Sequence, residues 1–215
     1  SLGYQIIWAN LAQREDVDVR RLFTDQQEPL HKKSELFGLS LSWELDGPVL
    51  LDLLEGQKIP IWSHQRKDND PIVFGGGPVL TANPEPFAPF LDVVLLGDGE
   101  NLLPKFIDTM LKIRSLSRNE KLLNLAQIDG IYVPSLYVPK YSNDGKLLAI
   151  EKKEPNIPTS VSKQTWQGQT LSHSKVITPD AVWPNIHLVE VVRSCPELCR
   201  FCLASYLTLP FRSSS

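Results

Sequence analysis

The chain has 215 residues, which is enough for one large domain or two small ones. Its 22 basic and 25 acidic residues give a net charge of −3, so a generally basic nucleic-acid-binding surface is not indicated. No apolar run approaches the length of a membrane span, and no signal peptide opens the sequence. We expect a globular protein of the reducing cytoplasm, an environment that suits three free thiols.

The first half of the chain predicts strands that alternate with helices. We expect strands at residues 17–23, 37–42, 72–74 and 92–96, and helices near residues 4–11, 48–55, 83–86, 103–111 and 118–128. This alternation is typical of βαβ units and a parallel sheet. Because α/β domains usually open with a strand, we also expect a further strand before Ser1.

Glycines cluster where two of these strands end. Gly75, Gly76 and Gly77 follow one strand, and the run Gly97–Glu100 follows another. In open parallel sheets ligands bind at the carboxyl ends of the strands, and glycine allows the backbone to approach a ligand closely. Glycines also simply turn the chain from strand to helix, and neither run matches a dinucleotide-binding or phosphate-loop motif.

The composition changes after residue 128. Residues 130–134 and 136–139 predict short strands that are cut by prolines, which suits sheet edges. Asn143-Asp144-Gly145 predicts a hairpin turn. Residues 152–185 are polar and without periodicity, and we interpret them as a linker toward the last part of the chain.

The chain has three cysteines, and all of them lie within eight residues. Cys195, Cys199 and Cys202 have C-x3-C-x2-C spacing and follow the apolar run 188–192, which predicts a buried strand. Thiolates are soft ligands that select iron–sulfur clusters, zinc or Cu(I). Three ligands are one fewer than a structural zinc or an ordinary four-iron cluster uses, so a cluster held here would keep one iron open.

Cysteines at close spacing can also belong to a disulfide framework or to a zinc site. A disulfide framework requires an even number of cysteines and a secreted context, and this sequence offers neither. A zinc site would require a fourth ligand, for which His173 and His187 are candidates.

The cysteine segment resembles the cluster motif of the radical SAM superfamily. The match is C-x3-C-x-aromatic-C, in which Phe201 is the aromatic residue, after an apolar strand. The resemblance implies that Cys195, Cys199 and Cys202 bind a [4Fe–4S] cluster and that its open iron binds S-adenosylmethionine. Reductive cleavage of that cofactor then yields a 5′-deoxyadenosyl radical. Phe201 would lie beside the adenine.

Residues 1–115 resemble the cobalamin-binding-type domain of one radical SAM subgroup. The similarity lies in the run 75–78, in Asn83-Pro84-Glu85-Pro86, in Asp92 and in the run 97–100. It implies that Gly75, Gly76 and Gly97 face a corrinoid. Many such domains ligate cobalt through the histidine of D-x-H-x-x-G, and neither His31 nor His64 lies in that motif. We therefore expect cobalamin binding to be weak or absent.

We predict an α/β fold in three parts. These are a Rossmann-like, flavodoxin-like parallel sheet (residues 1–115), a β-rich connector with a helix and a hairpin (116–185), and the first strand and cluster loop of a partial β/α barrel (186–215). The chain would be the front part of a radical SAM enzyme. Because the barrel would be incomplete, we expect the chain alone to be inactive.

The predicted reaction is [4Fe–4S]-dependent cleavage of S-adenosylmethionine, followed by radical attack on a substrate that the sequence does not name. The expected protein partner is an electron donor such as flavodoxin or ferredoxin. Two alternatives remain, a corrinoid-binding module without radical chemistry and a zinc-stabilised interaction protein. Metal analysis for iron and sulfide, cobalt or zinc distinguishes the three.

Overall fold

The computed structural model describes residues 2–24, 34–168 and 171–214. A four-stranded sheet forms its centre, in the order β1 (Leu36–Ser40), β2 (Ile72–Gly76), β3 (Val93–Leu95) and β4 (Ile131–Tyr132). The first three strands run parallel, and β4 is antiparallel to β3. The prediction of an α/β fold with a parallel sheet is confirmed.

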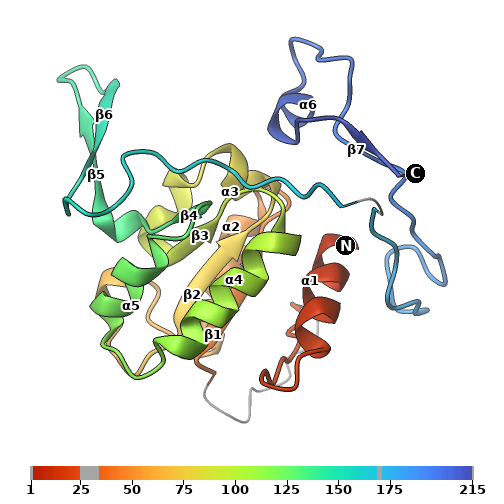
Figure 1. The fold of residues 1–215 in the computed structure, drawn as a ribbon, viewed down its shortest axis with the longest axis horizontal. Coiled ribbons are helices and arrows are strands. Elements are labelled where there is room, and N and C mark those ends of the chain that lie inside the picture. Colours follow the sequence, from red (N-terminus) through yellow and green to blue (C-terminus); the bar gives the residue numbers. More distant parts are fainter. Residues whose placement is uncertain (1, 25–33, 169–170, 215) are drawn as a thin grey trace.

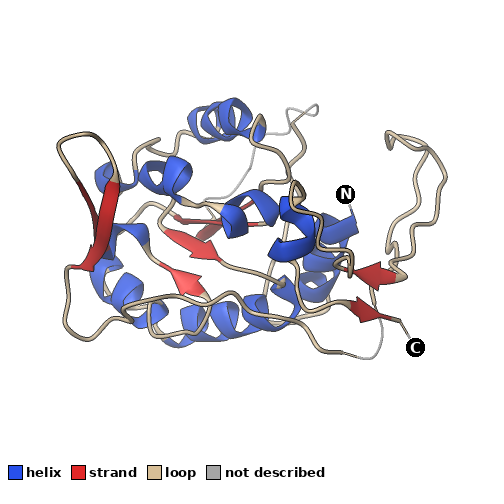
Figure 2. Cartoon of the chain, turned by 90° about the horizontal axis from the view of Figure 1, so that it is seen from above, coloured by secondary structure: helices blue, strands red, loops and turns tan. Residues whose placement is uncertain are grey.

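Helices cover both faces of this sheet. They are α1 (Leu2–Ala12), α2 (Asp46–Gly56), α3 (Pro78–Ala82), α4 (Gly99–Lys112) and α5 (Arg118–Leu125), with 3-10 turns η1 (Ser63–Gln65), η2 (Glu85–Phe90) and η3 (Pro134–Leu136). Helix α4 lies on one face beside α1, and α2 lies on the other (Figures 1 and 2). The strands between them are therefore apolar on both faces, and Val73, Val93 and Val94 are fully buried.

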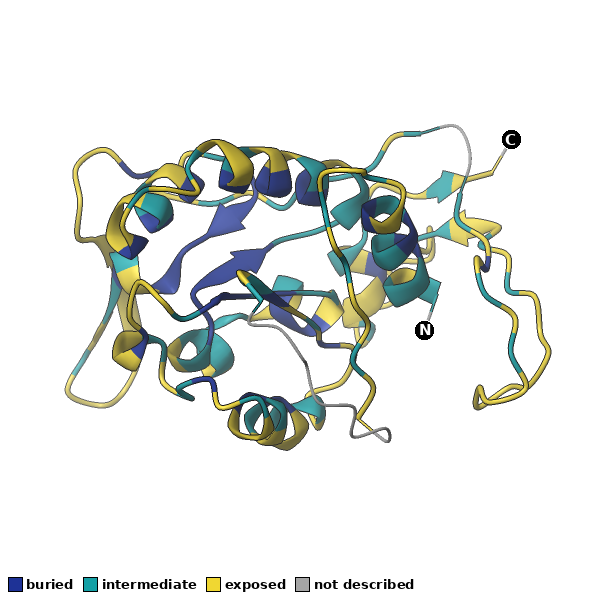
Figure 3. Cartoon of the chain, turned by 90° about the horizontal axis from the view of Figure 1, so that it is seen from below, coloured by how far each residue is buried: buried dark blue, intermediate teal, exposed yellow. Residues whose placement is uncertain are grey.

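Helix α4 contributes five buried side chains to the core. The predicted apolar face is present, since Leu103, Phe106, Ile107 and Met110 are buried, whereas Leu111 is exposed. The phenyl ring of Phe106 packs on that of Phe74 from β2, with ring centroids 4.8 Å apart. In Figure 3 the residues coloured as buried lie along the strands of the sheet and on parts of the helices that cover it.

The strand predicted at residues 17–23 is wrong. Residues 17–22 form no strand, Phe23 makes a single β-bridge, and the described four-stranded sheet has β1 at its edge. Its apolar residues Val17, Val19 and Leu22 pack partly buried against the core. These apolar residues are thus accommodated by side-chain packing rather than by a place in the described four-stranded sheet.

After α5 and β4, the connector forms a hairpin and continues as coil. Strands β5 (Tyr137–Tyr141) and β6 (Leu147–Lys152) pair antiparallel, and Gly145 in the turn has φ of 81°, as the hairpin signal predicts. The hairpin projects from the body of the molecule, and the following coil returns across it toward α3 (Figure 1). Ile157 is the buried anchor of this coil.

The buried strand predicted at residues 188–192 is also wrong. The structure contains only a short pair here, β7 (Val192–Arg193) with β8 (Arg212–Ser213), and the loop and helix α6 (Leu203–Leu207) lie between the two strands. Val189 and Val191 are 59% and 64% exposed. The segment contacts the connector through the bridge His173–Val189 and the hydrogen bond from Glu190 N to Ser172 O. A strand is buried only where a packed surface covers it, and the described residues offer none here.

No helix in the described ranges is long and apolar enough to cross a membrane.

Candidate metal centre

The three cysteines lie on the loop between β7 and α6. All are free thiols, and Cys195 and Cys199 are exposed while Cys202 is half-buried. The backbone N–H of Cys202 donates to the carbonyl of Cys199 at 2.9 Å, so the second half of the loop is a tight turn. Ser194 and Leu198 have positive φ angles of 75° and 48°, an uncommon conformation for non-glycine residues. Such backbone is found preferentially at ligand-binding loops.

Cys202 is the thiol whose surroundings favour the thiolate. The backbone N–H and the hydroxyl of Ser205, with a smaller effect from the backbone of Ala204, lower the pKa of the Cys202 thiol. Ser205 is fixed in turn, because its carbonyl accepts from Ser194 Oγ at 3.0 Å, and its hydroxyl oxygen also lies 3.1 Å from Cys202 O. A thiol must lose its proton to ligate a metal, so this arrangement suits a ligand.

The structure does not gather the thiols around one point. Among the residues that it describes, no three His, Cys, Asp or Glu side chains lie close enough together to hold a metal ion. The donor chemistry nevertheless fits a cluster, because the loop provides three accessible soft ligands. Convergence on a cluster would require a local rearrangement of the loop.

The two histidines considered as zinc ligands lie beside each other, His173 on the connector and His187 on the segment before the cysteines. The rings of His173 and His187 have centroids 5.8 Å apart. His173 Nε2 lies 3.2 Å from Lys175 Nζ, and a cation at that distance disfavours metal binding by the ring. Nothing in the described residues joins these rings to the cysteines as a metal-binding group.

Phe201 lies next to Cys202 and is 92% exposed. The ring thus has no protein partner to displace, and its predicted contact with adenine stays a prediction.

Two arginines flank the cysteine loop and reach back to the α/β domain. Arg193 precedes Cys195 by two residues, and its Nη2 donates to Glu100 Oε1 at 2.7 Å. Arg212 in β8 donates to Asp98 Oδ2. Asp98 and Glu100 stand at the carboxyl end of β3 and the start of α4. The cysteine loop is therefore tied to the edge of the sheet at which ligands usually bind.

The glycines predicted to face a corrinoid are surrounded by protein. A Cβ atom on Gly75 would lie 2.6 Å from Leu80 Cδ1, and one on Gly97 would lie 2.1 Å from Gln164 O. A Cβ on Gly76 would meet Leu95 O at 3.5 Å. These contacts explain Gly75 and Gly97 without a ligand. Their role toward a corrinoid stays a prediction.

The two histidines considered as cobalt ligands differ in what the structure shows of them. His64 is exposed in η1 beside Trp62, as expected for a solvated histidine. His31 lies outside the described residues.

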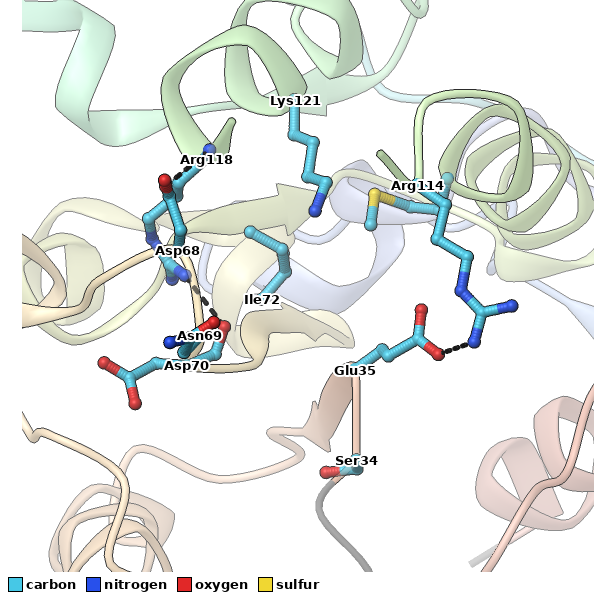
Figure 4. Close-up of a pocket in the computed structure, with 10 residues that line it drawn as sticks. Ser34, Glu35, Asp68, Asn69, Asp70, Ile72, Arg114, Arg118 and Lys121 are labelled. Carbon is cyan, nitrogen blue, oxygen red and sulfur yellow. Dashed lines mark hydrogen bonds and ion pairs between the residues drawn. The ribbon is translucent and has the colours of Figure 1, made fainter. Parts of the chain in front are cut away.

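A cavity of about 310 Å3 lies at the opposite end of the sheet (Figure 4). Its walls come from the amino ends of β1 and β2 and from α4 and α5, and they carry Glu35, Asp68, Asp70, Arg114, Arg118 and Lys121. Arg114 pairs with Glu35, and Arg118 is held by Asp92 and by backbone carbonyls. The cavity is thus distant from the cysteine loop along the sheet, and both of its arginines are held in ion pairs.

The structure thus combines an α/β domain with a three-thiol segment that is tied to the carboxyl end of β3. The chain matches the model of the family described as "Radical SAM proteins, N-terminal" over residues 7–134, more than half of its length. The chain belongs to this family. The matched range comprises the α/β domain and ends before the cysteines.

A second comparison concerns a longer protein. The chain is 25% identical over 212 residues to an uncharacterized protein of Methanocaldococcus jannaschii. The alignment covers 98% of this chain and 39% of that protein. The chain thus spans well under half the length of this relative.

Asp98, Glu100, Arg193 and Arg212 were not predicted as site residues. The sequence predicts a ligand loop at residues 97–100 from its glycines, and not from its two carboxylates. A signal existed for Arg193, since a cation two residues before a cysteine motif is a candidate for loop positioning, but its acidic partners Asp98 and Glu100 lie far away in the sequence.

Proposed function

We propose that Cys195, Cys199 and Cys202 hold a [4Fe–4S] cluster and that this chain acts as part of a radical SAM enzyme. The observation that carries the proposal is the loop itself. It presents three free thiols, two of them exposed, in a chain without any other cysteine. Membership of the radical SAM N-terminal family supports the same conclusion.

The cysteines and Phe201 of the loop would have different roles in binding the cluster and S-adenosylmethionine. Cys202 provides the ligand whose thiol pKa is lowered by its surroundings, and Cys195 and Cys199 are accessible for assembly of the cluster. A cluster held by these three thiolates would supply the electron for reductive cleavage of S-adenosylmethionine. Phe201, with its free ring face, is placed in sequence to contact the adenine.

The exposure of the loop also supports an external electron donor. A small redox protein such as flavodoxin or ferredoxin could approach Cys195 and Cys199 closely. We place the reaction in the cytoplasm, because its reducing conditions keep such thiols free.

We further propose that residues 1–115 have the architecture of the cobalamin-type subgroup but bind cobalamin weakly or not at all. Two observations at single residues support weak or absent cobalamin binding. His64 lies in a solvated turn, and the backbone of Gln164 occupies the space in front of Gly97.

Anaerobic reconstitution of the 215-residue chain with iron and sulfide tests the cluster proposal. We expect about four irons per chain for the unaltered protein. Cys195→Ala, Cys199→Ala and Cys202→Ala should each lose most of this iron. Ser160→Ala, at an exposed position of the connector, is the matched control and should retain it. Iron content that survives any one of the three cysteine substitutions would contradict the proposal.

A further inference from the structure

The edge of the sheet that binds ligands in related folds is covered here by the chain's own connector. Gln164 N donates to Leu96 O at 2.8 Å, and Asp98 N donates to Gln164 O at 2.9 Å. The two hydrogen bonds make a parallel bridge between Gln164 and Gly97, which has φ of 97°. The connector therefore crosses the carboxyl end of β3 in direct backbone contact.

Asp98 joins this crossing to the end of the described chain. Its Oδ2 accepts from Trp166 N at 2.8 Å and from Arg212 Nη1. Arg212 Nη1 also donates to Trp166 O at 2.7 Å. Asp98, Trp166 and Arg212 thus form one closed network, in which the Asp98 and Arg212 side chains are only 16% and 13% exposed.

Arg193 binds the other side of the same loop. Its Nη1 lies 3.3 Å from Asp98 Oδ1, and its Nη2 donates to Glu100 Oε1 at 2.7 Å. Its Nε and Nη2 also donate to the two carboxylate oxygens of Glu190, both at 2.8 Å. Hydrogen bonds between such charged groups are about twice as strong as neutral ones.

The pairing of β7 with β8 brings two like charges together. Arg193 and Arg212 are directly opposite each other across the two strands. Like charges at such cross-strand positions are destabilising. Asp98 contacts both guanidinium groups and neutralises their repulsion. Strands β7 and β8 are the two ends of the cysteine segment. They meet at Asp98 of the α/β domain, which contacts an arginine from each strand.

We propose that Asp98 and Glu100 form an acidic latch that positions the cysteine loop on the α/β domain. They are positioning residues, since they act through Arg193 and Arg212 rather than on a cofactor. In this arrangement the connector and the cysteine segment occupy the carboxyl end of β3. Its importance for catalysis rests on the proposed function, whereas its existence does not.

Hydrogen–deuterium exchange on the metal-free 215-residue chain tests the latch directly. Asp98→Asn removes the charge that Arg193 and Arg212 share, so exchange at residues 191–193 and 212–214 should accelerate about tenfold. Arg212→Gln should accelerate the same amides. Asp98→Glu restores the charge and should restore part of the protection. Asp52→Asn, at an exposed site on α2, is the matched control and should change nothing.

Two results would overturn the latch. One is unchanged exchange at residues 212–214 in Asp98→Asn. The other is equal acceleration at residues 72–76 of β2, which would indicate general loss of stability. Because no cluster is present in this experiment, its outcome is independent of whether the cysteines bind iron.

A spectroscopic readout then connects the latch to the cluster. After reconstitution, Asp98→Asn should give a broadened or altered electron paramagnetic resonance signal relative to the unaltered protein, and Asp98→Glu should recover it. Identical spectra for all three proteins would contradict a positioning role. A failure to reconstitute the unaltered protein would instead contradict the proposed function.

Discussion

At the scale of single residues, a buried carboxylate holds the α/β domain together. Asp92 is 2% exposed, and its Oδ2 accepts from Arg66 at 2.9 Å, Arg118 at 2.6 Å and Val73 N at 2.8 Å. Burial is the main cause that lowers the pKa of Arg66, with Asp92 opposing the effect. The carboxylate thus links the loop before β2, the strand itself and the start of α5.

Substitution of this carboxylate should be costly. Asp92→Asn would leave two buried guanidinium groups without their shared anion, a change of about 3–5 kcal/mol in the free energy of unfolding. Urea denaturation measures the loss, with Asp52→Asn as the exposed control. A cost similar to that of the control would show that the network is dispensable.

Gly97 is the second residue whose identity the structure explains. A side chain here would combine a positive φ with a Cβ only 2.1 Å from Gln164 O. Gly97→Ala should therefore destabilise the protein by about 1–3 kcal/mol and displace the connector. Gly56→Ala, where a Cβ meets nothing within 4 Å, is the control. Equal melting temperatures for the two variants would contradict this role of Gly97.

At the scale of elements, α5 begins with a capping box. Ser117 accepts from the backbone N–H of Glu120, and the Glu120 side chain accepts from Ser117 N at 2.9 Å. The Ser117 hydroxyl, which donates to Glu120 Oε2 at 2.6 Å, and the Ser117 backbone N–H both lower the pKa of the Glu120 carboxyl. A depressed carboxyl pKa contributes stability above the unfolded-state pKa, and that contribution is lost as pH falls through the folded-state pKa.

This capping box gives a pH-dependent prediction. Glu120→Ala should lower the melting temperature at neutral pH, and the difference from the unaltered protein should shrink once Glu120 is protonated in both states. Thermal melts monitored by circular dichroism across the acid range measure it. A difference that stays constant or grows toward low pH would contradict the assigned role.

The elements show which features the sequence could predict. Strands β1, β2 and β3 and helix α4 were predicted because their apolar patterns match the period of the element that they form. The apolar run at residues 188–192 has the same composition but is largely exposed. An apolar pattern reports the preference of the residues, not the presence of a surface that could cover them. The same limit applies to the stretch 17–23.

The candidate site was predictable only in part. Three cysteines within eight residues indicate a metal-binding loop from spacing alone. The positioning of that loop depends on contacts between residues 98–100 and residues 193 and 212, which no local pattern reveals. Such long-range pairs require a structure.

At the scale of the whole molecule, the α/β domain serves as a support for the cysteine segment. The connector crosses the carboxyl end of β3, and the acidic latch fixes the segment beyond it. This arrangement predicts that the domain does not take up a corrinoid at the same edge. Equilibrium titration with hydroxocobalamin should show no tight binding. Tight binding with the spectrum of a histidine-ligated cobalt would contradict this prediction and would identify His31 or His64 as the ligand to examine by substitution.

We propose that the three cysteines hold a [4Fe–4S] cluster with one iron open to S-adenosylmethionine. Electron paramagnetic resonance of the anaerobically reconstituted and reduced chain tests it most directly, because a ligand on the open iron alters the signal. We predict a four-iron signal that changes when S-adenosylmethionine is added and does not change with S-adenosylhomocysteine at low concentration. Stoichiometric zinc in the purified protein, with no cluster obtainable by reconstitution, would contradict the claim.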